Sequence, residues 1–195
     1  TTGRSKGAML TNHNLLSNAQ MLKDYWDWRD DDVLIHALPI FHVHGLFVAI
    51  HGALINGSQM LWHSRFDAQR VLADMPRATV LMGVPTFYTR LLALPGLNAQ
   101  VCSGMRLFIS GSAPMLVDTF ESWQQRTGHT VLERYGMSET VMLTSNPCTL
   151  DERFGGASQR IGGSVGFPLP GVSLRIVDDQ GLPLACGEVG SIQVK

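Results

Sequence analysis

The segment TVLMGVPTFYTRLL, residues 79–92, contains the strand and helix on which the predicted fold is built. Its first six residues are nearly all apolar, which is typical of a strand buried in a parallel sheet. Pro85 follows at once, and proline is favoured in the first turn of a helix because its missing N–H needs no partner there. The segment therefore predicts a buried strand over 79–84 and a helix over 86–94.

The same alternation of strand and helix extends in both directions along the chain. Apolar runs predict further strands over residues 33–38, 59–63, 106–109 and 130–134. Helical spacing and capping residues predict helices from the Thr11 cap to Asp30–Asp32, over 46–55, over 68–75, and from Pro114 to near Gly128. This alternation predicts an α/β fold, with a doubly wound, mostly parallel sheet and flanking helices.

The pattern changes after about Gly162. Residues 164–195 show short alternating strands, turns and no helix signal, which predicts the start of a small β-barrel-like subdomain. The polar, glycine-rich stretch before them reads as a connecting loop. We therefore expect the α/β part over 1–144, the loop over 145–163 and the β-rich part over 164–195.

Composition excludes several classes of protein. Only 16% of the 195 residues are charged, below the average of roughly 25% for soluble domains, which indicates a large buried core. The net charge of −1 offers no basic field for nucleic acid or anionic membranes. Cys102, Cys148 and Cys186 lie far apart without CxxC spacing, so neither a disulfide framework nor a zinc site is indicated.

The stretch from Val33 to Ser64 contains no Asp, Glu, Lys or Arg, which raises the possibility of a membrane span. Pro39 and three glycines interrupt it, and its longest apolar helical piece is far shorter than the ~20 residues that a span needs. We interpret it as a buried strand and helix. No signal peptide is visible, although a chain lacking its true beginning could not show one.

In open α/β sheets, ligands bind beyond the carboxyl ends of the strands. The predicted strand ends carry residues that a purely structural loop does not need. They lie in PIFHVHG (39–45), PTFYTR (85–90), SGSAP (110–114) and RYGMSET (134–140), and the opening loop TTGRSKG (1–7) adds a fifth segment. Their convergence predicts a site at this edge of the sheet.

The opening loop has the chemistry of a phosphate site. Gly3 and Gly7 permit close backbone approach, Thr1 and Thr2 offer hydroxyl and amide groups, and Lys6 adds positive charge. It does not match the Walker A pattern, because no Ser or Thr follows the lysine. The alternative is a solvated surface turn.

The YGMSET segment favours a nucleotide. Tyr135 can stack on a base, Glu139 is an oxygen ligand suited to Mg²⁺, and Ser138 and Thr140 can bond phosphate oxygens. For Glu139 the alternative is an exposed carboxylate at a helix start.

The opening loop, GSAP and YGMSET, in this order and at these separations, resemble the adenylate-forming enzymes: acyl-CoA synthetases, luciferases and peptide-synthetase adenylation domains. GSVGFPLPGV and GEVGSIQVK resemble the family's segments leading into its small barrel. The family's phosphate loop carries another Thr-Ser-Gly upstream. The resemblance therefore implies an internal fragment of the large domain, without the C-terminal domain that bears the catalytic lysine.

The resemblance implies roles for particular residues. Thr1, Thr2, Gly3 and Lys6 would hold the β- and γ-phosphates of ATP, and Glu139 would bind Mg²⁺. The nucleotide pocket would comprise Gly111, Ser112, Ala113 and Pro114 together with Tyr135, Gly136, Met137, Ser138 and Thr140, with Tyr135 on the adenine and Thr140 near the α-phosphate. Lys6, Glu139 and Thr140 would act in catalysis.

Two arginines bear on the acyl group. Arg90 and Arg134 occupy strand-end segments, and a buried guanidinium is unfavourable unless an anion meets it. A substrate with a second carboxylate would supply that anion through bidentate bonds. The alternatives are a helix-surface position for Arg90 and a structural acid as partner for Arg134.

Four segments, among them RATVLMGVPTFYTRLL and GHTVLERYGMSET, are similar in sequence to segments of the malonate–CoA ligases. That resemblance implies that Arg90 and Arg134 bind malonate's free carboxylate and that His42 and His44 flank the acyl and CoA channel. Metal binding by the two histidines is an alternative that no nearby Cys or carboxylate supports, and a core role for His44 is another.

We therefore expect an ATP-, Mg²⁺- and coenzyme A-dependent ligase that forms malonyl-CoA, AMP and pyrophosphate through malonyl-adenylate. Its partners are a small carboxylate and CoA, without nucleic acid or a membrane span. The expected compartment is the bacterial cytoplasm, or the mitochondrial matrix of a eukaryote. Alternatives are another acid, such as methylmalonate or a short- or medium-chain fatty acid, and a non-catalytic nucleotide-binding fragment.

Overall fold

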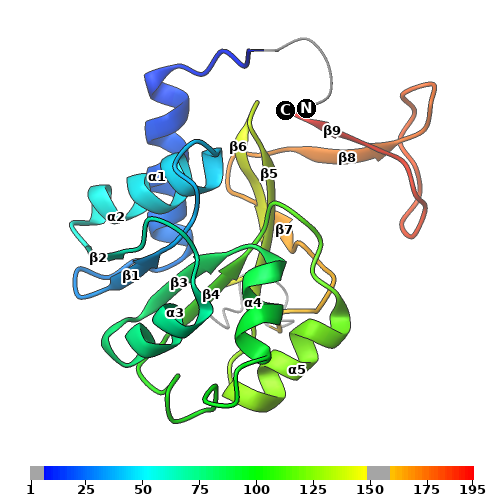
Figure 1. The fold of residues 1–195 in the computed structure, drawn as a ribbon. Coiled ribbons are helices and arrows are strands. Elements are labelled where there is room, and N and C mark those ends of the chain that lie inside the picture. The colour runs from blue at the N-terminus through cyan, green and yellow to red at the C-terminus, as the bar shows by residue number, and fades with distance from the viewer. Residues whose placement is uncertain (1–6, 149–158) are drawn as a thin grey trace.

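The computed structural model describes residues 7–148 and 159–195. The predicted phosphate-loop residues Thr1, Thr2, Gly3 and Lys6 lie outside the described residues. Within them, one sheet of seven strands has the order β2-β1-β3-β4-β5-β6-β7 (Figure 1). Its strands are β1 (Val33–His36), β2 (Gln59–Trp62), β3 (Val80–Gly83), β4 (Leu107–Ser110), β5 (Leu132–Met137), β6 (Val141–Ser145) and β7 (Phe167–Pro168).

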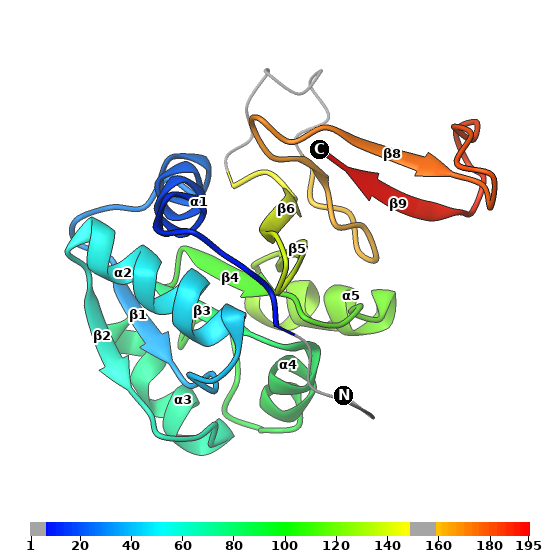
Figure 2. The same cartoon turned by 90° about the horizontal axis from the view of Figure 1, so that it is seen from above.

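Helices cover both faces of this sheet. Figure 2 shows α1 and α2 on one face and α3, α4 and α5 on the other. The helical elements are α1 (Asn12–Tyr25), the π-helical segment η1 (His44–Ile50), α2 (His51–Asn56), α3 (Ala68–Asp74), the 3₁₀ turn η2 (Met75–Arg77), α4 (Pro85–Leu92) and α5 (Val117–Thr127). The predicted doubly wound α/β fold is confirmed.

Most helices begin where the capping residues predict. The Thr11 hydroxyl accepts a hydrogen bond from Asn14 N and forms a capping box at the start of α1. The Asp67 carboxylate accepts from Arg70 N at the start of α3, and Pro85 opens α4. The N–H groups of the first helical turn lack partners within the helix. The Thr11 and Asp67 side chains accept hydrogen bonds from such groups, and Pro85 has no N–H that needs a partner.

Several helix boundaries differ from prediction. Helix α1 ends at Tyr25 rather than at Asp30–Asp32, with Trp26 as its C-cap. Helix α5 begins at Val117 rather than at Pro114, because the chain is still extended at Leu116 (φ −69°, ψ 139°). In addition, the helix predicted over 46–55 begins at His44 and is π-helical in its first half. Gly57 ends it in the left-handed conformation (φ 75°).

The far edge of the sheet holds a feature that sequence reasoning missed. Strands β2 to β5 run parallel, whereas β6 returns antiparallel to β5 and β7 pairs antiparallel with β6. The strand predicted over 130–134 continues to Met137, so the YGMSET segment forms a β-hairpin rather than a loop at a strand end. No helix separates β6 from β5, so a prediction based on alternating strands and helices does not find β6.

The last described residues form a separate two-stranded antiparallel sheet, β8 (Leu174–Val177) with β9 (Ser191–Val194). Figure 1 shows it projecting beyond the main sheet. In this part of the described chain the strands make a hairpin and no closed barrel. None of the helices over the described ranges is long and apolar enough to cross a membrane.

An aromatic cluster joins α4 and α5 to the sheet. Trp123 of α5 is fully buried and meets Tyr88 and Phe108 edge-on, each with ring centroids 4.9 Å apart. The Tyr88 hydroxyl donates to Ile109 O at 2.7 Å. Edge-to-face aromatic packing of this kind is directional. It fixes α4 and α5 against the carboxyl-end half of β4, from which the site loops extend.

Candidate active site at the carboxyl ends of the parallel strands

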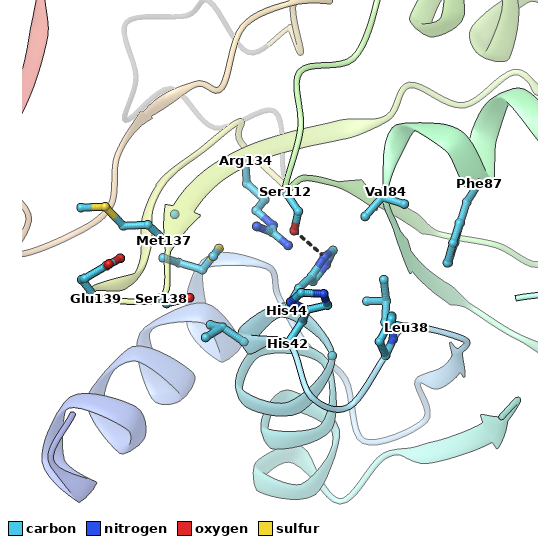
Figure 3. Close-up of a pocket in the computed structure, with 15 residues that line it drawn as sticks. Leu38, His42, His44, Val84, Phe87, Ser112, Arg134, Met137, Ser138 and Glu139 are labelled. Atoms are coloured by element: carbon cyan, nitrogen blue, oxygen red, sulfur yellow. Dashed lines mark hydrogen bonds between the residues drawn. The ribbon is translucent and has the colours of Figure 1, made fainter. Parts of the chain in front are cut away.

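A cavity of about 600 Å³ lies where β1, β3, β4 and β5 end (Figure 3). Parallel strands place their carboxyl ends at one edge, which is why segments far apart in sequence meet there. Its wall is formed by Leu38, Pro39, His42, Val43, His44, Gly45, Val84, Phe87, Ser112, Arg134, Gly136, Met137, Ser138, Glu139 and Met142.

Arg134, in β5, is the charged group buried in this wall. Its side chain points into the cavity beside Ser112 and His44 (Figure 3), and the residue is only 3% exposed. Guanidinium atoms Nε and Nη2 are buried and have no hydrogen-bond partner within residues 7–148 and 159–195. Burial lowers the pKa of Arg134 to about 9. The site therefore holds a cation whose charge nothing in the described part of the chain neutralises by an ion pair.

Gly111 makes the room that this guanidinium occupies. A Cβ built at Gly111 would lie 2.6 Å from both Nε and Nη1 of Arg134, well inside van der Waals contact. The glycine of the SGSAP segment is thus required by close approach of a side chain. It lets Arg134 lie flat against the backbone that follows β4.

Ser112 and His44 form a polar pair across the cavity. Ser112 Oγ lies 3.3 Å from His44 Nδ1, as the dashed line in Figure 3 marks. Ser112 adopts φ 68°, a left-handed conformation that is uncommon for a residue with a side chain. His44 is buried at the first position of η1, and in the described part of the chain its Nε2 has no hydrogen-bond partner. Burial, then the nearby charges of Arg134, His36 and His42, hold the pKa of His44 well below its usual value, so it is neutral.

The turn of the β5–β6 hairpin closes the opposite side of the cavity. Met137, Ser138 and Glu139 line it, and Thr140 N donates to Met137 O at 3.2 Å. The next residue, Val141, has φ 60°, which is a genuine outlier for a β-branched side chain. Backbone strain of this kind persists only where the surroundings hold it.

Glu139 also lines a second, smaller cavity of about 400 Å³ between the hairpin and α1, and Thr140 lines this second cavity alone. The Thr140 hydroxyl is buried with no hydrogen-bond partner among the described residues, whereas the Glu139 side chain is exposed. The hairpin thus places a carboxylate between the two cavities and a hydroxyl beside the second.

The structure brings most of the predicted strand-end residues together. His42, His44, Ser112, Arg134, Gly136, Met137, Ser138 and Glu139 all line the first cavity. Tyr135 is half-buried in β5, and Ala113 and Pro114 are exposed before α5, but these three do not line it.

Arg90 is not brought to this cavity. It is exposed on α4, and its guanidinium carbon lies 5.0 Å from the centroid of the Phe66 ring. Phe66 stacks on Phe87 with ring centroids 3.7 Å apart, and Phe87 lines the cavity. Two aromatic rings therefore separate Arg90 from the space that Arg134 faces.

Sequence reasoning missed Glu133, the residue before Arg134 in β5, which bonds the backbone of two neighbouring loops. Its carboxylate is buried and accepts hydrogen bonds from Gly163 N at 2.9 Å and Met115 N at 3.4 Å. Burial raises the pKa of Glu133 despite these bonds. A charged residue in a predicted buried strand is the signal that could have identified it.

The described residues contain no cluster of three or more His, Cys, Asp or Glu side chains that could hold a metal ion. Glu139 alone provides one carboxylate. This donor set fits Mg²⁺ only in the manner usual for nucleotide sites, where one or two carboxylates act with substrate phosphates.

Comparison with known proteins places this geometry in a family. The family model described as "AMP-binding enzyme" matches residues 1–195. The chain belongs to the AMP-binding enzyme family. The resemblance to adenylate-forming enzymes seen in the opening loop, GSAP and YGMSET is thereby confirmed.

Members of the AMP-binding family that resemble this chain include malonate–CoA ligases. The chain is 39% identical to the mitochondrial malonate–CoA ligase of Homo sapiens. The match covers 95% of this chain and 34% of the human protein. ATP-bound MatB from Rhodopseudomonas palustris matches all of the chain and 37% of that structure, with 55% identity and a TM-score of 0.93. A malonyl-CoA ligase in a product complex with methylmalonyl-CoA and AMP is 41% identical, with a TM-score of 0.83, over all of the chain and 41% of that structure.

The chain thus spans about a third of the length of the curated AMP-binding relatives it matches. What the complete proteins bind and catalyse is a property of those longer chains.

Proposed function

We propose that this chain supplies the nucleotide and carboxylate sites of an AMP-forming acid–thiol ligase whose substrate is malonate. The reaction joins malonate and ATP into malonyl-adenylate with release of pyrophosphate. The thiol of CoA then attacks the acyl carbon and AMP leaves. We further propose that the chain is the middle part of a longer protein, since its relatives are about three times as long.

The observation that carries the proposal is the unpartnered guanidinium of Arg134. A buried charge without a partner is strongly unfavourable. A carboxylate can accept two parallel bonds from a guanidinium, and such bonds are among the strongest hydrogen bonds in proteins. Arg134 lines the cavity, and its Nε and Nη2 are buried with no hydrogen-bond partner among the described residues. Malonate retains one carboxylate after the other is activated, and that carboxylate would supply the missing counter-charge of the guanidinium.

The other side of the cavity suits the reacting end of the substrate. The hairpin turn would hold the α-phosphate with Thr140, whose buried hydroxyl has no partner. Glu139 with the ATP phosphates would hold Mg²⁺, which when bound neutralises phosphate charge. Tyr135 would stack on the adenine, next to Gly111 and the exposed loop residues Ala113 and Pro114. Lys6 and its neighbours Thr1, Thr2 and Gly3 would hold the outer phosphates.

His42 and His44 would border the path of the acyl group and CoA. His44 is neutral and its Nε2 is free, so it can donate or accept one hydrogen bond without adding charge. Arg90 remains a proposed second partner for the carboxylate, although its guanidinium now lies over Phe66. Catalysis in such a site comes mainly from positioning and from electrostatic stabilisation of a charged transition state.

Similarity to malonate–CoA ligases supports malonate. The relative solved with methylmalonyl-CoA supports methylmalonate as a second candidate, because it is 41% identical to this chain. One methyl group changes binding by only ~1–3 kcal/mol, so a site for one acid can accept the other.

The test is AMP release by the complete protein with ATP, Mg²⁺ and CoA, and with malonate, methylmalonate, acetate or octanoate. Arg134→Ala and Arg90→Ala are compared with Arg70→Ala, an exposed arginine of α3. We expect kcat/KM for malonate to fall roughly 10- to 100-fold in Arg134→Ala, the size expected for lost hydrogen bonds to a charged group. The Arg70 variant should match the wild type. Equal turnover of octanoate, unchanged by Arg134→Ala, would overturn the malonate proposal while retaining adenylate formation.

A further inference from the structure

Two side chains of helix α1 bond the site hairpin: Tyr25 donates to Ser145 O at the far end of β6, and Asn18 bonds Met142 next to the turn. Asn18 Nδ2 donates to Met142 O at 3.1 Å, and Met142 N donates to Asn18 Oδ1 at 3.4 Å. The two residues are 124 positions apart in sequence. A side-chain amide that both donates and accepts in this way replaces one residue of a neighbouring strand.

The bond occupies a place that the sheet leaves empty. Met142 opposes Gly136 of β5 on one side. On the other side, β7 pairs with Thr144 and Ser145, and the next residue, Leu169, donates from its N to Leu143 O at 2.9 Å, so the described pairing stops one residue short of Met142. The N–H and C=O of Met142 would therefore lack a strand partner at this edge. The half-buried side chain of Asn18 on α1 supplies the missing partners, a donor for the C=O and an acceptor for the N–H.

The tether acts on the strained part of the hairpin. Met142 directly follows Val141, which has φ 60°. A Cβ at Gly136 would clash with Val141 O and lie 2.9 Å from Met142 Cα, so the two strands are tightly apposed at this point. A strained turn needs surroundings that over-determine its conformation. The Asn18 bonds hold the backbone of Met142, which directly follows the strained Val141 and is two residues after Thr140.

Helix α1 is also the element that follows the opening loop. It begins at Asn12, capped by Thr11, and the described chain leads into it from Gly7. The second cavity lies between α1 and the hairpin, and Asn18, Glu139 and Thr140 all line it. A change in the distance between α1 and Met142 would therefore move Thr140 relative to α1 and to the chain that leads into it.

We infer that Asn18 is a positioning residue for the nucleotide: through the Met142 backbone it fixes Ser138, Glu139 and Thr140 relative to α1. This inference rests on the proposed function, because it assigns the hairpin to ATP. It does not place Asn18 in contact with the substrate. Arg134, on the acyl side of the first cavity, pairs with Ser145 at the other end of β6 from the residues that Asn18 holds.

Three variants of the complete protein test the inference. Asn18→Ala removes both bonds. Asn18→Asp keeps the shape of the side chain and one acceptor but places a carboxylate, without a donor, against Met142 O. Gln20→Ala is the matched control, because Gln20 is exposed on the same helix and lines neither cavity.

The expected result is a split between the two substrates. Asn18→Ala should raise KM for ATP about tenfold, from the loss of two hydrogen bonds, and leave KM for malonate unchanged. Asn18→Asp should be at least as impaired, since the space is filled but the donor is lost. Gln20→Ala should match the wild type. Wild-type KM for ATP in Asn18→Asp, or equal rises in both KM values in Asn18→Ala, would overturn the inference and leave Asn18 a packing role.

Hydrogen exchange separates this inference from the proposed function. The amide of Met142 should exchange faster in Asn18→Ala than in Gln20→Ala, with the amides of α1 unchanged. Unchanged protection of Met142 overturns the tether whatever the activity. A wild-type protein that releases no AMP with any acid tested would overturn the proposed function, and the exchange measurement would still decide whether Asn18 fixes the hairpin.

Discussion

The guanidinium of Arg134 lies against Gly111 so closely that a Cβ at position 111 would come within 2.6 Å of its Nε and Nη1. The two residues belong to neighbouring strands, since Gly111 directly follows β4 and Arg134 lies within β5. Because the end of an arginine side chain can move, a methyl group at position 111 would displace the guanidinium at little cost to the fold.

We therefore expect Gly111→Ala to lower kcat/KM for malonate several-fold while the unfolding free energy falls by only about 1 kcal/mol. The reason is that the displaced Arg134 no longer meets the carboxylate in the same place. Gly104→Ala is the control, since its added Cβ would meet Ala78 O at an ordinary 3.8 Å. Unchanged malonate kinetics in Gly111→Ala would contradict the role given to this contact.

Ser112 combines backbone strain with a hydrogen bond to His44. Its left-handed φ of 68° costs about 1 kcal/mol relative to glycine. We expect Ser112→Gly to raise the unfolding free energy, measured in urea, by up to that amount, and Ser112→Ala to lower it. Both variants lose the hydroxyl that faces His44 Nδ1, so both should lose activity. Equal stability of the two variants would show that the backbone conformation carries no strain.

The sequence specified the location of this site better than its details. His42, His44, Ser112 and Arg134 could be brought together from sequence because each lies at or after the end of a predicted buried parallel strand, and such strands end at one edge. Arg90 could not be placed, because residues of α4 can face the cavity or solvent, and helical spacing alone does not distinguish them. The Asn18–Met142 bonds span 124 residues, and no local pattern predicts a contact over that distance.

His44 predicts a pH dependence of stability. Burial holds the pKa of His44 well below its usual value of 6.5 in the folded protein. As the pH falls through 6.5, the unfolded state binds a proton that the folded state does not, so the unfolding free energy decreases.

His44→Gln should therefore lose less stability than the wild type between pH 7.5 and 5.5, measured by urea unfolding. His36 and His129, whose pKa values burial also lowers, keep part of the pH dependence in the variant. Exposed His13→Gln should behave like the wild type. An identical loss in the wild type and the His44 variant would show that the buried imidazole does not contribute.

Asp32 and Arg106 form a buried ion pair away from the site. Arg106 Nε donates to Asp32 Oδ1 at 2.9 Å, and Thr79 Oγ1 donates to the same oxygen at 2.7 Å. Burial alone raises the pKa of Asp32, but the bonds from Arg106, Arg29 N and Thr79 outweigh it and lower the pKa. The stabilisation is therefore present above the unfolded pKa and is lost as the pH falls through the folded one.

Removing one partner of this pair should be strongly destabilising, because it leaves a buried charge without a counter-charge. We expect Asp32→Asn to lower the unfolding free energy by about 3–5 kcal/mol. Adding Arg106→Met to this variant should recover part of the loss. The double-mutant cycle in urea measures the coupling, and additive effects of the two substitutions would contradict a direct pairing.

The π-helical segment His44–Ile50 sets the direction in which His44 faces relative to α2. A π-helix accommodates more residues per turn than the α-helix α2 that continues it. Deleting one residue within 45–50 would let the segment relax into a regular α-helix, at little cost to the remaining hydrogen bonds. An α-helix with one residue fewer, at about 100° per residue, turns through nearly the same angle as the π-helix, so His44 would keep its direction relative to α2. A regular α-helix over all seven residues would instead turn His44 by about 100°, away from Ser112. The π-helix thus carries one more residue than an α-helix needs here, while His44 still faces the cavity.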